Sequence, residues 1–443
     1  MNFLTNIFHL NKENKKERIS WYFYDFANSA FATTVISVFL GPYFTYIANQ
    51  SVNINGKISF LWFQISAGAF YPIVVAISVF LQLFIIPFFS SLADHTRFKK
   101  HILFVATYIG AISTLSLFFV DKTNLYFGAL LFIIANVCFG LSCAVYNSYL
   151  NHITVRTEAD TVSFIGWGLG YFGGGMLLLF NLLFYSNAKL FGIEKDFAIR
   201  ICLSSAGIWW GIFSLIPLKY LRQTYHQKII NNKKHILKNG FNSLNNTIKD
   251  LKNYPQVKFF IIAYMLYNDG IQSVIILAGQ FGNIELGLDM NVLIICILIV
   301  QFVAFLGVFI FNKISEKVGA LNTLRTTIIF WIWILIFAFG YLYTERDFYF
   351  LCICVGLVLG TSQALSRSIF SQIIPSGKET EYFSIYELSD KGTSWLGPII
   401  YAVVFNWTLS YRYAILSLII FFVIGFIMLM KFNFEKSVVL IKE

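Results

Sequence analysis

An acid, an amide and a hydroxyl lie close together in the otherwise apolar stretch "YDFANSAF", residues 24–31. Residues three and four positions apart share one face of a helix, so Asp25, Asn28 and Ser29 would form a single polar stripe. A carboxylate is costly in hydrocarbon and therefore pairs with a cation, takes up a proton or lines water. The stripe predicts a site for a proton or a small polar solute, although Asp25 alone also fits an interfacial acid near the positive end of a helix dipole.

The same pattern recurs in the second half of the chain, in "YNDGIQSVI", residues 267–275. Asp269, Gln272 and Ser273 repeat the spacing of the first acid, amide and hydroxyl. Such an echo is expected if two halves of the chain are related by a pseudo-two-fold axis along the membrane normal. We therefore predict that the two stripes face each other across one interior cavity. The predicted site for substrate or proton consists of these residues: Asp25, Asn28, Ser29, Asn268, Asp269, Gln272 and Ser273.

Aromatic residues make up 19% of the chain, and most of them are expected to pack against lipid or to lie at the membrane interface. A Tyr lies just before each of the two repeated acids. Four aromatic residues are therefore candidates to line the cavity: Tyr24, Tyr267, Trp167 and Trp395.

Four further charged residues fall inside apolar runs near the C-terminus, and we predict gating or ion-pair roles for them. Glu387 and Lys391 have the favourable helical order of an acid four residues before a base, which leaves Asp390 for another partner. Arg367 and Asp390 both lie about 10 Å deep at the helical rise, so these two side chains could pair. Three interpretations are open: the pair could couple a gate to the cargo, clamp a carboxylate of the cargo, or only join two helices.

The elements that must position these residues are membrane spans. The chain is 57% hydrophobic and 12% charged, and its mean hydropathy of +0.68 is far above that of a soluble domain. Apolar runs of about twenty residues, long enough to cross about 30 Å of hydrocarbon, recur along its length. The sequence predicts an all-α integral membrane protein with twelve transmembrane helices. The runs lie at 19–48, 69–90, 101–120, 124–150, 161–184, 200–221, 257–281, 291–311, 325–343, 349–373, 383–405 and 412–431.

A basic polar segment, residues 222–256, divides the predicted spans into six and six. Most of the 33 Lys and Arg residues fall in this segment and in other loops on the same side, which the positive-inside rule assigns to the cytoplasm. The apolar residues of 222–256 have nearly helical spacing, which predicts an interfacial helix. The predicted organisation is a cytoplasmic arm (1–18), a six-helix bundle (19–221), a linker (222–256), a second six-helix bundle (257–431) and a cytoplasmic tail (432–443).

Glycines recur every four residues in the predicted fifth span, at Gly166, Gly170 and Gly174. Small residues at this spacing let two helices approach closely, so we predict tight helix packing along this face. A glycine loop that binds phosphate would need a preceding strand, which these apolar runs do not offer.

Four segments, taken in chain order, together resemble the vacuole-effluxer branch of the major facilitator superfamily: "YDFANSAFATTV", "GLGYFGGGMLLL", "YNDGIQSVI" and "QALSRSIFSQIIPSGKETEYFSIYELSDKGTSWLGP". The resemblance covers nearly the whole chain and implies two pseudo-symmetric six-helix bundles, the major facilitator fold. It also implies secondary transport by alternating access. The branch includes bacterial permeases and a fungal vacuolar permease that exports amino acids, so amino acids are the first cargo that it implies.

The loop after the second predicted span, "SSLADHTRFKK", residues 90–100, is similar to the signature cytoplasmic motif of the same superfamily. Ser90 and Arg97 stand where glycines are usual, while Asp94, Lys99 and Lys100 match the motif. In the family this acid pairs with a neighbouring helix and holds the inner gate shut, and the resemblance implies the same role for Asp94. The alternative is a solvated loop that only obeys the charge rule.

These features predict a secondary or facilitative transporter of a small polar solute, with amino acids as cargo and proton coupling as the finer predictions. The alternatives are an efflux carrier for amphipathic compounds and a receptor or scaffold that transports nothing. Enzyme, cofactor and metal chemistry are not expected, because the six Cys lie in apolar spans and the six His lie in the tail, loops or span ends. The expected partners are the solute, protons and the lipid bilayer, whose anionic surface explains the net charge of +11 without nucleic acid or an obligate protein partner. We expect the chain in a bacterial inner membrane, with both termini in the cytoplasm.

Overall fold

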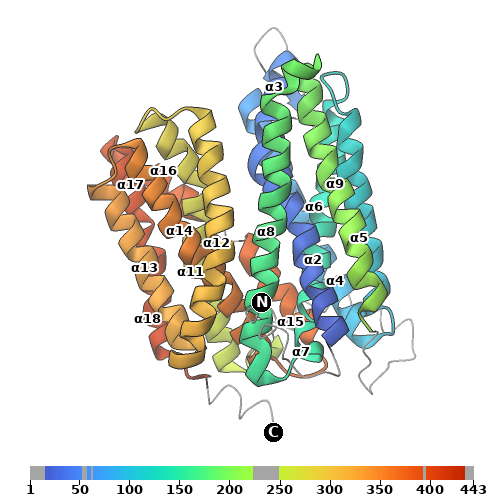
Figure 1. The fold of residues 1–443 in the computed structure, drawn as a ribbon. Coiled ribbons are helices and arrows are strands. Elements are labelled where there is room, and N and C mark those ends of the chain that lie inside the picture. The colour runs from blue at the N-terminus through green and yellow to red at the C-terminus, as the bar shows by residue number, and fades with distance from the viewer. Residues whose placement is uncertain (1–14, 52–56, 61–62, 223–248, 393–395, 435–443) are drawn as a thin grey trace, which may run out of the picture.

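The helices of this chain gather into two groups that lie side by side (Figure 1). The computed structural model describes residues 15–51, 57–60, 63–222, 249–392 and 396–434. The first group contains α2 (Lys15–Ala30), the π-helix η2 (Phe31–Phe39), α3 (Leu40–Gln50), α4 (Ala67–His95), α5 (Lys99–Ser116), α6 (Leu125–Asn147), α8 (Ala159–Ser186) and α9 (Lys195–Tyr220). The second contains α11 (Pro255–Ile284), α12 (Met290–Val318), α13 (Ala320–Gly340), α14 (Glu345–Ile373), α15 (Glu379–Gly392), α16 (Leu396–Thr408), α17 (Tyr411–Ser417) and α18 (Ile419–Lys431). The short connecting elements are β1 (Lys57–Phe60), β2 (Phe63–Ser66), η3 (Leu117–Phe119), α7 (Leu150–Ile153), η4 (Arg156–Glu158) and η5 (Ala188–Phe191).

Within the described residues, 11 helical segments are long and apolar enough to cross a membrane, from Lys15–Gln50 to Tyr411–Lys431. α15 and α16 together cover most of the remaining predicted run, 383–405. Each predicted span therefore overlaps a helix. Of the segment 222–256, for which an interfacial helix is predicted, residues 223–248 lie outside the described part of the chain.

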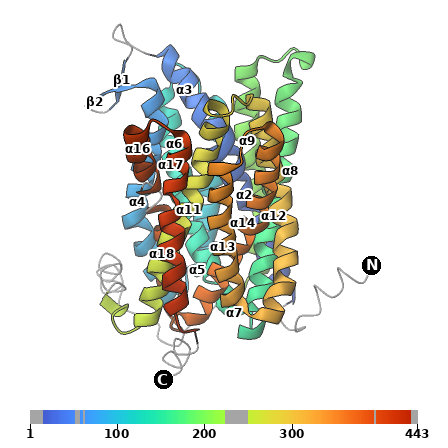
Figure 2. The ribbon, with the colours of Figure 1, turned by 90° about the vertical axis from the view of Figure 1, so that its left-hand side faces the viewer.

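The two groups meet at one end of the molecule. α2 begins, α9 ends, α11 begins and α18 ends at this end, which is the lower one in Figures 1 and 2 and which we call the linker end. Here α15 of the second group packs against α4 and α6 of the first, and α8 packs against α12 and α14. Most of the polar contacts between the groups that are described below lie near this end, and the Tyr171 hydroxyl of α8 also donates to Gln363 Oε1 of α14 further along both helices.

The glycine row of α8 brings α2 unusually close. A Cβ atom at Gly166 would lie 2.7 Å from the Asp25 carboxylate, and one at Gly170 would lie 2.8 Å from the Ser29 hydroxyl. At Gly174 the Cβ atom would lie 3.2 Å from the backbone oxygen of Ser29. The prediction of tight packing along this face is thus confirmed, and the polar stripe of α2 is the surface that packs there.

Asp250 lies in the short described segment before α11 and contacts the start of α15. Its Oδ2 accepts hydrogen bonds from Lys378 Nζ at 2.7 Å and from the Tyr382 hydroxyl at 3.1 Å. Burial opposes the charge of Asp250, but the hydrogen bond and positive charge of Lys378 outweigh it, so the pKa of this carboxyl lies below its ordinary value.

We expect Asp250→Asn to lower the free energy of unfolding at pH 7 by a few tenths to about 1 kcal/mol, the usual range for such a pair near the surface. A depressed pKa stabilises the fold above the pKa of the unfolded chain, about 3.9, and this stabilisation is lost as pH falls through the folded value. Thermal unfolding of the purified protein from pH 7 down to pH 3.5 measures the difference between variant and parent. A difference that stays constant over this range would contradict the assignment.

Candidate functional site

A buried arginine joins the two groups of helices. Arg367 lies in α14 about 9 Å from the linker end at the helical rise, and it is 1% exposed. Its Nη1 donates to Oδ2 of Asp25 in α2 at 2.9 Å. The partner predicted from the sequence was Asp390, whose side chain lies outside the described part of the structure. The described carboxylate partner of Arg367 is Asp25, in the other group.

Nearly all hydrogen-bond donors of Arg367 are occupied. Nε donates to the Ser163 hydroxyl at 3.0 Å, Nη2 to the Ser163 carbonyl at 2.9 Å, and Nη1 also to Asn147 Oδ1 at 3.2 Å. With the bond to Asp25, these contacts use four of the five N–H groups of the guanidinium. A clamp on a cargo carboxylate would need two parallel free N–H groups. In this conformation the guanidinium therefore holds the helix groups together and has no free pair for an anion.

Two tryptophans enclose the same guanidinium. The carbon Cζ of Arg367 lies 4.7 Å from the Trp21 ring centroid and 5.2 Å from that of Trp167. A planar guanidinium stacks favourably on aromatic faces, which offsets part of its lost hydration. Trp167, a predicted cavity aromatic, is thus placed against Arg367.

Asn147 extends the network to a second acid. Its Nδ2 donates to Glu387 Oε1 in α15 at 2.7 Å, while its Oδ1 accepts from Arg367. α2, α6, α14 and α15 are thereby joined through side chains alone. The side chains of Asp390 and Lys391, and all of Trp395, fall outside the described part of the chain, so their predicted roles stay predictions.

The signature loop also reaches across to α15. Asp94 Oδ2 accepts the backbone N–H of Glu381 in the first turn of α15 at 2.9 Å. Lys100 Nζ donates to the Leu221 carbonyl at 2.7 Å, and Lys99 Nζ lies over the Tyr149 ring at 4.9 Å. We use the name seam for the contact of Asp25, Asp94 and residues 147–163 of the first group with residues 367–387 of the second.

Asp269 lies inside the second group in different surroundings. It is 1% exposed, and neither carboxylate oxygen accepts a hydrogen bond from the described residues. The Ser273 hydroxyl, one turn further on, also has no partner in that part of the chain. Gly397 at the start of α16 packs against this stripe and leaves no room for a side chain beside Ser273. Asp269 is therefore a buried acid that forms no ion pair with any described residue.

The other predicted site residues are distributed around the two acids. Asn28 is buried and donates to Cys143 Sγ at 3.6 Å, while Asn268 is buried and Gln272 is half-buried. The Tyr24 hydroxyl lies 2.8 Å from that of Thr107, and the Tyr267 hydroxyl lies 2.6 Å from that of Ser366. The stripe of Asp25 and Ser29 packs against α8, and Ser273 of the second stripe packs against α16. A single cavity between the two stripes therefore stays a prediction.

Sequence reasoning missed three side chains of the seam. Asn147 and Ser163 are short polar residues within apolar runs, and such residues are too common to mark a site. Asn147 lies six residues before the end of the fourth helical span, and Arg367 lies six residues before the end of the tenth. These two spans correspond in the repeat, so the position of Arg367 could have pointed to Asn147. Asp160 lies one residue before the predicted fifth span and was therefore treated as part of a loop.

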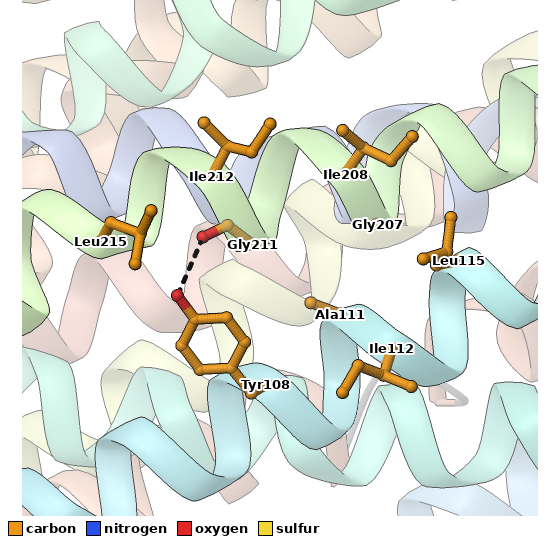
Figure 3. Close-up of a pocket in the computed structure, with 9 residues that line it drawn as sticks. All are labelled: Tyr108, Ala111, Ile112, Leu115, Gly207, Ile208, Gly211, Ile212 and Leu215. Atoms are coloured by element: carbon orange, nitrogen blue, oxygen red, sulfur yellow. Dashed lines mark hydrogen bonds between the residues drawn. The ribbon is translucent and has the colours of Figure 1, made fainter.

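A groove elsewhere on the molecule lies between α5 and α9 (Figure 3). Its only drawn hydrogen bond joins the Tyr108 hydroxyl to the Gly211 carbonyl at 3.3 Å. Ile112, Ile208 and Ile212 on its walls are about half exposed, as expected for a surface that contacts lipid. The groove contains none of the predicted site residues.

A family model identifies the family of this chain, and similar solved structures show its fold. The family model described as "Vacuole effluxer Atg22 like" matches residues 13–440. The MFS-type transporter YxiO of Bacillus subtilis is 28% identical over 94% of this chain and 95% of its own length. Autophagy-related protein 22 of Kluyveromyces lactis is 26% identical over 93% of this chain and 92% of its own. The proton:xylose symporter XylE is 12% identical and superposes with a TM-score of 0.70 over 94% of this chain and 95% of its own.

These matches confirm the predicted all-α, twelve-helix major facilitator fold and the prediction that the chain is a transporter and not an enzyme. The chain is a multi-pass membrane protein. It belongs to the vacuole effluxer Atg22-like family of major facilitator transporters.

Proposed function

We propose that this chain carries a small polar solute across the membrane by alternating access, coupled to protons, with amino acids as the first solutes to test. In this cycle the two helix bundles rock around a central site, so that one end opens as the other closes. The proposal of amino acids as the solute rests only on the resemblance to the vacuole-effluxer branch, and the match to the model of that family supports it.

The observation that carries the proposal is the Asp25–Arg367 pair at 2.9 Å across the two groups. A static scaffold gains little from a buried ion pair, because desolvation consumes much of the attraction. In a transporter the pair can form when the linker end closes. When that end opens, the pair breaks and water hydrates both charges. The Asn147–Glu387 and Asp94–Glu381 contacts act in the same way.

Proton coupling is supported by the surroundings of Asp269. Asp269 is buried and forms no ion pair with any described residue, and an intramembrane acid in such surroundings is typical of a proton relay. Gly397 leaves no room for a side chain beside the neighbouring Ser273, so α16 packs directly on this polar stripe. Exposure to water as the cavity opens would release this proton.

We place the protein in a bacterial inner membrane with the linker end in the cytoplasm. The orientation rests on the excess of Lys and Arg in the loops and termini of that side. The choice of a bacterial membrane is supported by the similarity to YxiO of Bacillus subtilis. In this orientation the structure is closed toward the cytoplasm.

The test begins with a thermal-shift screen of the purified protein against amino acids, peptides, nucleosides and sugars, because a bound solute stabilises by mass action. Solutes that raise the melting temperature are then followed in proteoliposomes with an imposed pH gradient. We expect a polar solute to accumulate and the accumulation to collapse when the gradient is removed. Binding without any flux would overturn the proposal in favour of a receptor, and preferential flux of lipophilic dyes would favour an efflux carrier for amphipathic compounds.

A further inference from the structure

The groove between α5 and α9 lies on the outer side of the first group, away from the second (Figures 1 and 3). The helices that pack against α5 and α9 are α2, α4, α6 and α8 of their own group. Gly211 and Ala111 form the floor, since a Cβ atom at Gly211 would meet its nearest atom, Ala111 Cβ, only at 3.7 Å. The walls include Ile112, Ile208 and Ile212, which are about half exposed. The groove is therefore apolar and open toward the surrounding bilayer.

α5 and α9 run antiparallel, and two hydrogen bonds show how they are aligned. The Tyr108 hydroxyl donates to the Gly211 carbonyl within the groove at 3.3 Å. Toward the linker end, Lys100 Nζ donates to the Leu221 carbonyl at 2.7 Å. The start of α5 thus lies beside the end of α9, and the groove points to this junction.

The junction is basic. Lys219 is exposed and follows Ile212 by seven residues, which places it on the same face of α9, and Arg222 is 78% exposed just beyond the end of that helix. Lys100 uses only one of its three donors in the bond to α9. The carboxylate bonded here is that of Glu17, whose Oε1 accepts the backbone N–H of Arg222 at 2.9 Å. Three cations around one carboxylate leave this end of the groove positively charged.

The distance from the cations to the far part of the groove matches one leaflet of a membrane. Ile208 lies eleven residues before Lys219, which is about 16 Å at the helical rise. Half of a hydrocarbon core of about 30 Å has nearly the same length. Exposed Tyr220 and Phe98 lie at the level of the cations, where aromatic side chains are typical of the membrane interface. A charged headgroup and an apolar chain can therefore occupy the junction and the groove together.

We propose that this face of the first group binds one phospholipid with an anionic headgroup. Its phosphate lies against Lys100, Lys219 and Arg222, and one of its acyl chains lies in the groove between α5 and α9. The groove selects little among lipids, because every lipid tail is as apolar as its walls. Selection comes from the cations, each of which favours an anionic headgroup by about fivefold. All the residues belong to the first group, so the site does not depend on the transport cycle proposed above.

A second copy of this chain fits the groove less well. Gly207 and Gly211 have the spacing of a helix-dimer motif, but Gly207 is already covered by α5. A Cβ atom at Gly207 would lie 2.5 Å from the backbone nitrogen of Leu115. The spacing thus serves the packing of α5 on α9. Two copies in the same orientation would also bring their basic ends together, which repel each other.

The test measures the affinity of the full-length protein for its first bound lipid by native mass spectrometry in detergent. Phosphatidylglycerol, which is anionic, and phosphatidylcholine, which has no net charge, are compared with identical acyl chains. Lys219→Gln combined with Arg222→Gln removes two cations of the site. Its matched control, Lys252→Gln combined with Lys317→Gln, removes two exposed cations from the linker end of the second group.

A second pair of variants tests the groove. Gly211→Leu fills it, and the Cβ atom itself is tolerated because it meets only ordinary van der Waals contacts. The matched control is Gly340→Leu in α13, where a Cβ atom meets nothing within 4 Å.

We expect the parent to prefer phosphatidylglycerol and the charge variant to lose roughly 30-fold in affinity for it. The charge control should keep the preference of the parent. Gly211→Leu should weaken both lipids by about threefold, a modest loss because chain packing in an apolar medium contributes only van der Waals contact. Gly340→Leu should bind both lipids as the parent does.

Equal affinity of the parent for the two lipids, or an equal loss in the charge variant and its control, would overturn the inference. A dimer that Gly211→Leu abolishes while lipid binding is unchanged would assign the groove to a second copy. Neither result bears on solute flux, which tests the proposed function separately.

Discussion

Arg367→Ala is expected to open the linker end more than any other single substitution in the seam. The variant leaves Asp25 buried beside α8 without its cation, and breaking a buried pair in this way costs about 3–5 kcal/mol. Because the open state hydrates Asp25, this cost falls on the closed state alone and shifts the closed-to-open ratio by roughly 100- to 4,000-fold. Spin-label distances across the linker end measure the shift, and proteoliposome flux should fall because the closed state is no longer populated.

Two companion variants separate charge from geometry. Arg367→Lys keeps the charge but cannot reach Asn147 and both oxygen atoms of Ser163 with one ammonium, so we expect an intermediate loss. Asp25→Asn combined with Arg367→Ala should be more closed than Arg367→Ala alone, since it removes the uncompensated charge. If the double variant is no more closed than the single one, the pair does not hold the seam.

Asp269→Asn is expected to abolish proton-driven accumulation while leaving exchange of solute across the membrane. An amide cannot carry the proton, so a gradient of one pH unit, which drives about tenfold accumulation for one proton per solute, would drive none. Solute counterflow at equal pH needs no net proton movement and should continue. Both are measured in the same proteoliposomes with the solute that the thermal-shift screen identifies.

The matched control for this prediction is Asp121→Asn. Asp121 lies in the connection between η3 and α6, outside the spans, and caps its own loop through the backbone N–H of Thr123 at 2.8 Å. We expect it to transport as the parent does. Retention of full accumulation by Asp269→Asn would contradict its role in proton coupling.

The sequence predicts the positions of the helices, but it does not predict which side chains of the two bundles contact each other. Each span follows from about twenty apolar residues, a local property, and the glycine row of α8 follows from a four-residue spacing. The partner of Arg367 lies 342 residues away in the chain, and no local pattern marks Asp25 in place of Asp390. Which acid receives the guanidinium depends on how the two bundles are docked, and in an alternating-access protein that docking changes during the cycle.

The two acids of the repeat have different surroundings in the structure. Asp25 and Asp269 occupy matching positions in their halves, yet the first has a cation at 2.9 Å and the second has no ion pair to a described residue. The difference arises because the second half supplies an arginine in α14 where the first half has Asn147 in α6. A repeated motif therefore predicts where the backbone of each acid lies. Whether the acid forms an ion pair depends on the residue that a neighbouring helix supplies.

Gly166 of α8 lies against both members of the Asp25–Arg367 pair, so substitutions at these three positions constrain one another. A Cβ atom there would lie 2.7 Å from Asp25 Oδ2 and 2.8 Å from Arg367 Nη2, so one methyl group would disturb both members of the ion pair. A substitution at any one of these three positions therefore changes what is tolerated at the other two, although they lie on three different helices. Homologues that lose the charge pair are the ones in which a larger residue can replace this glycine, and divergence at the three sites should be concerted.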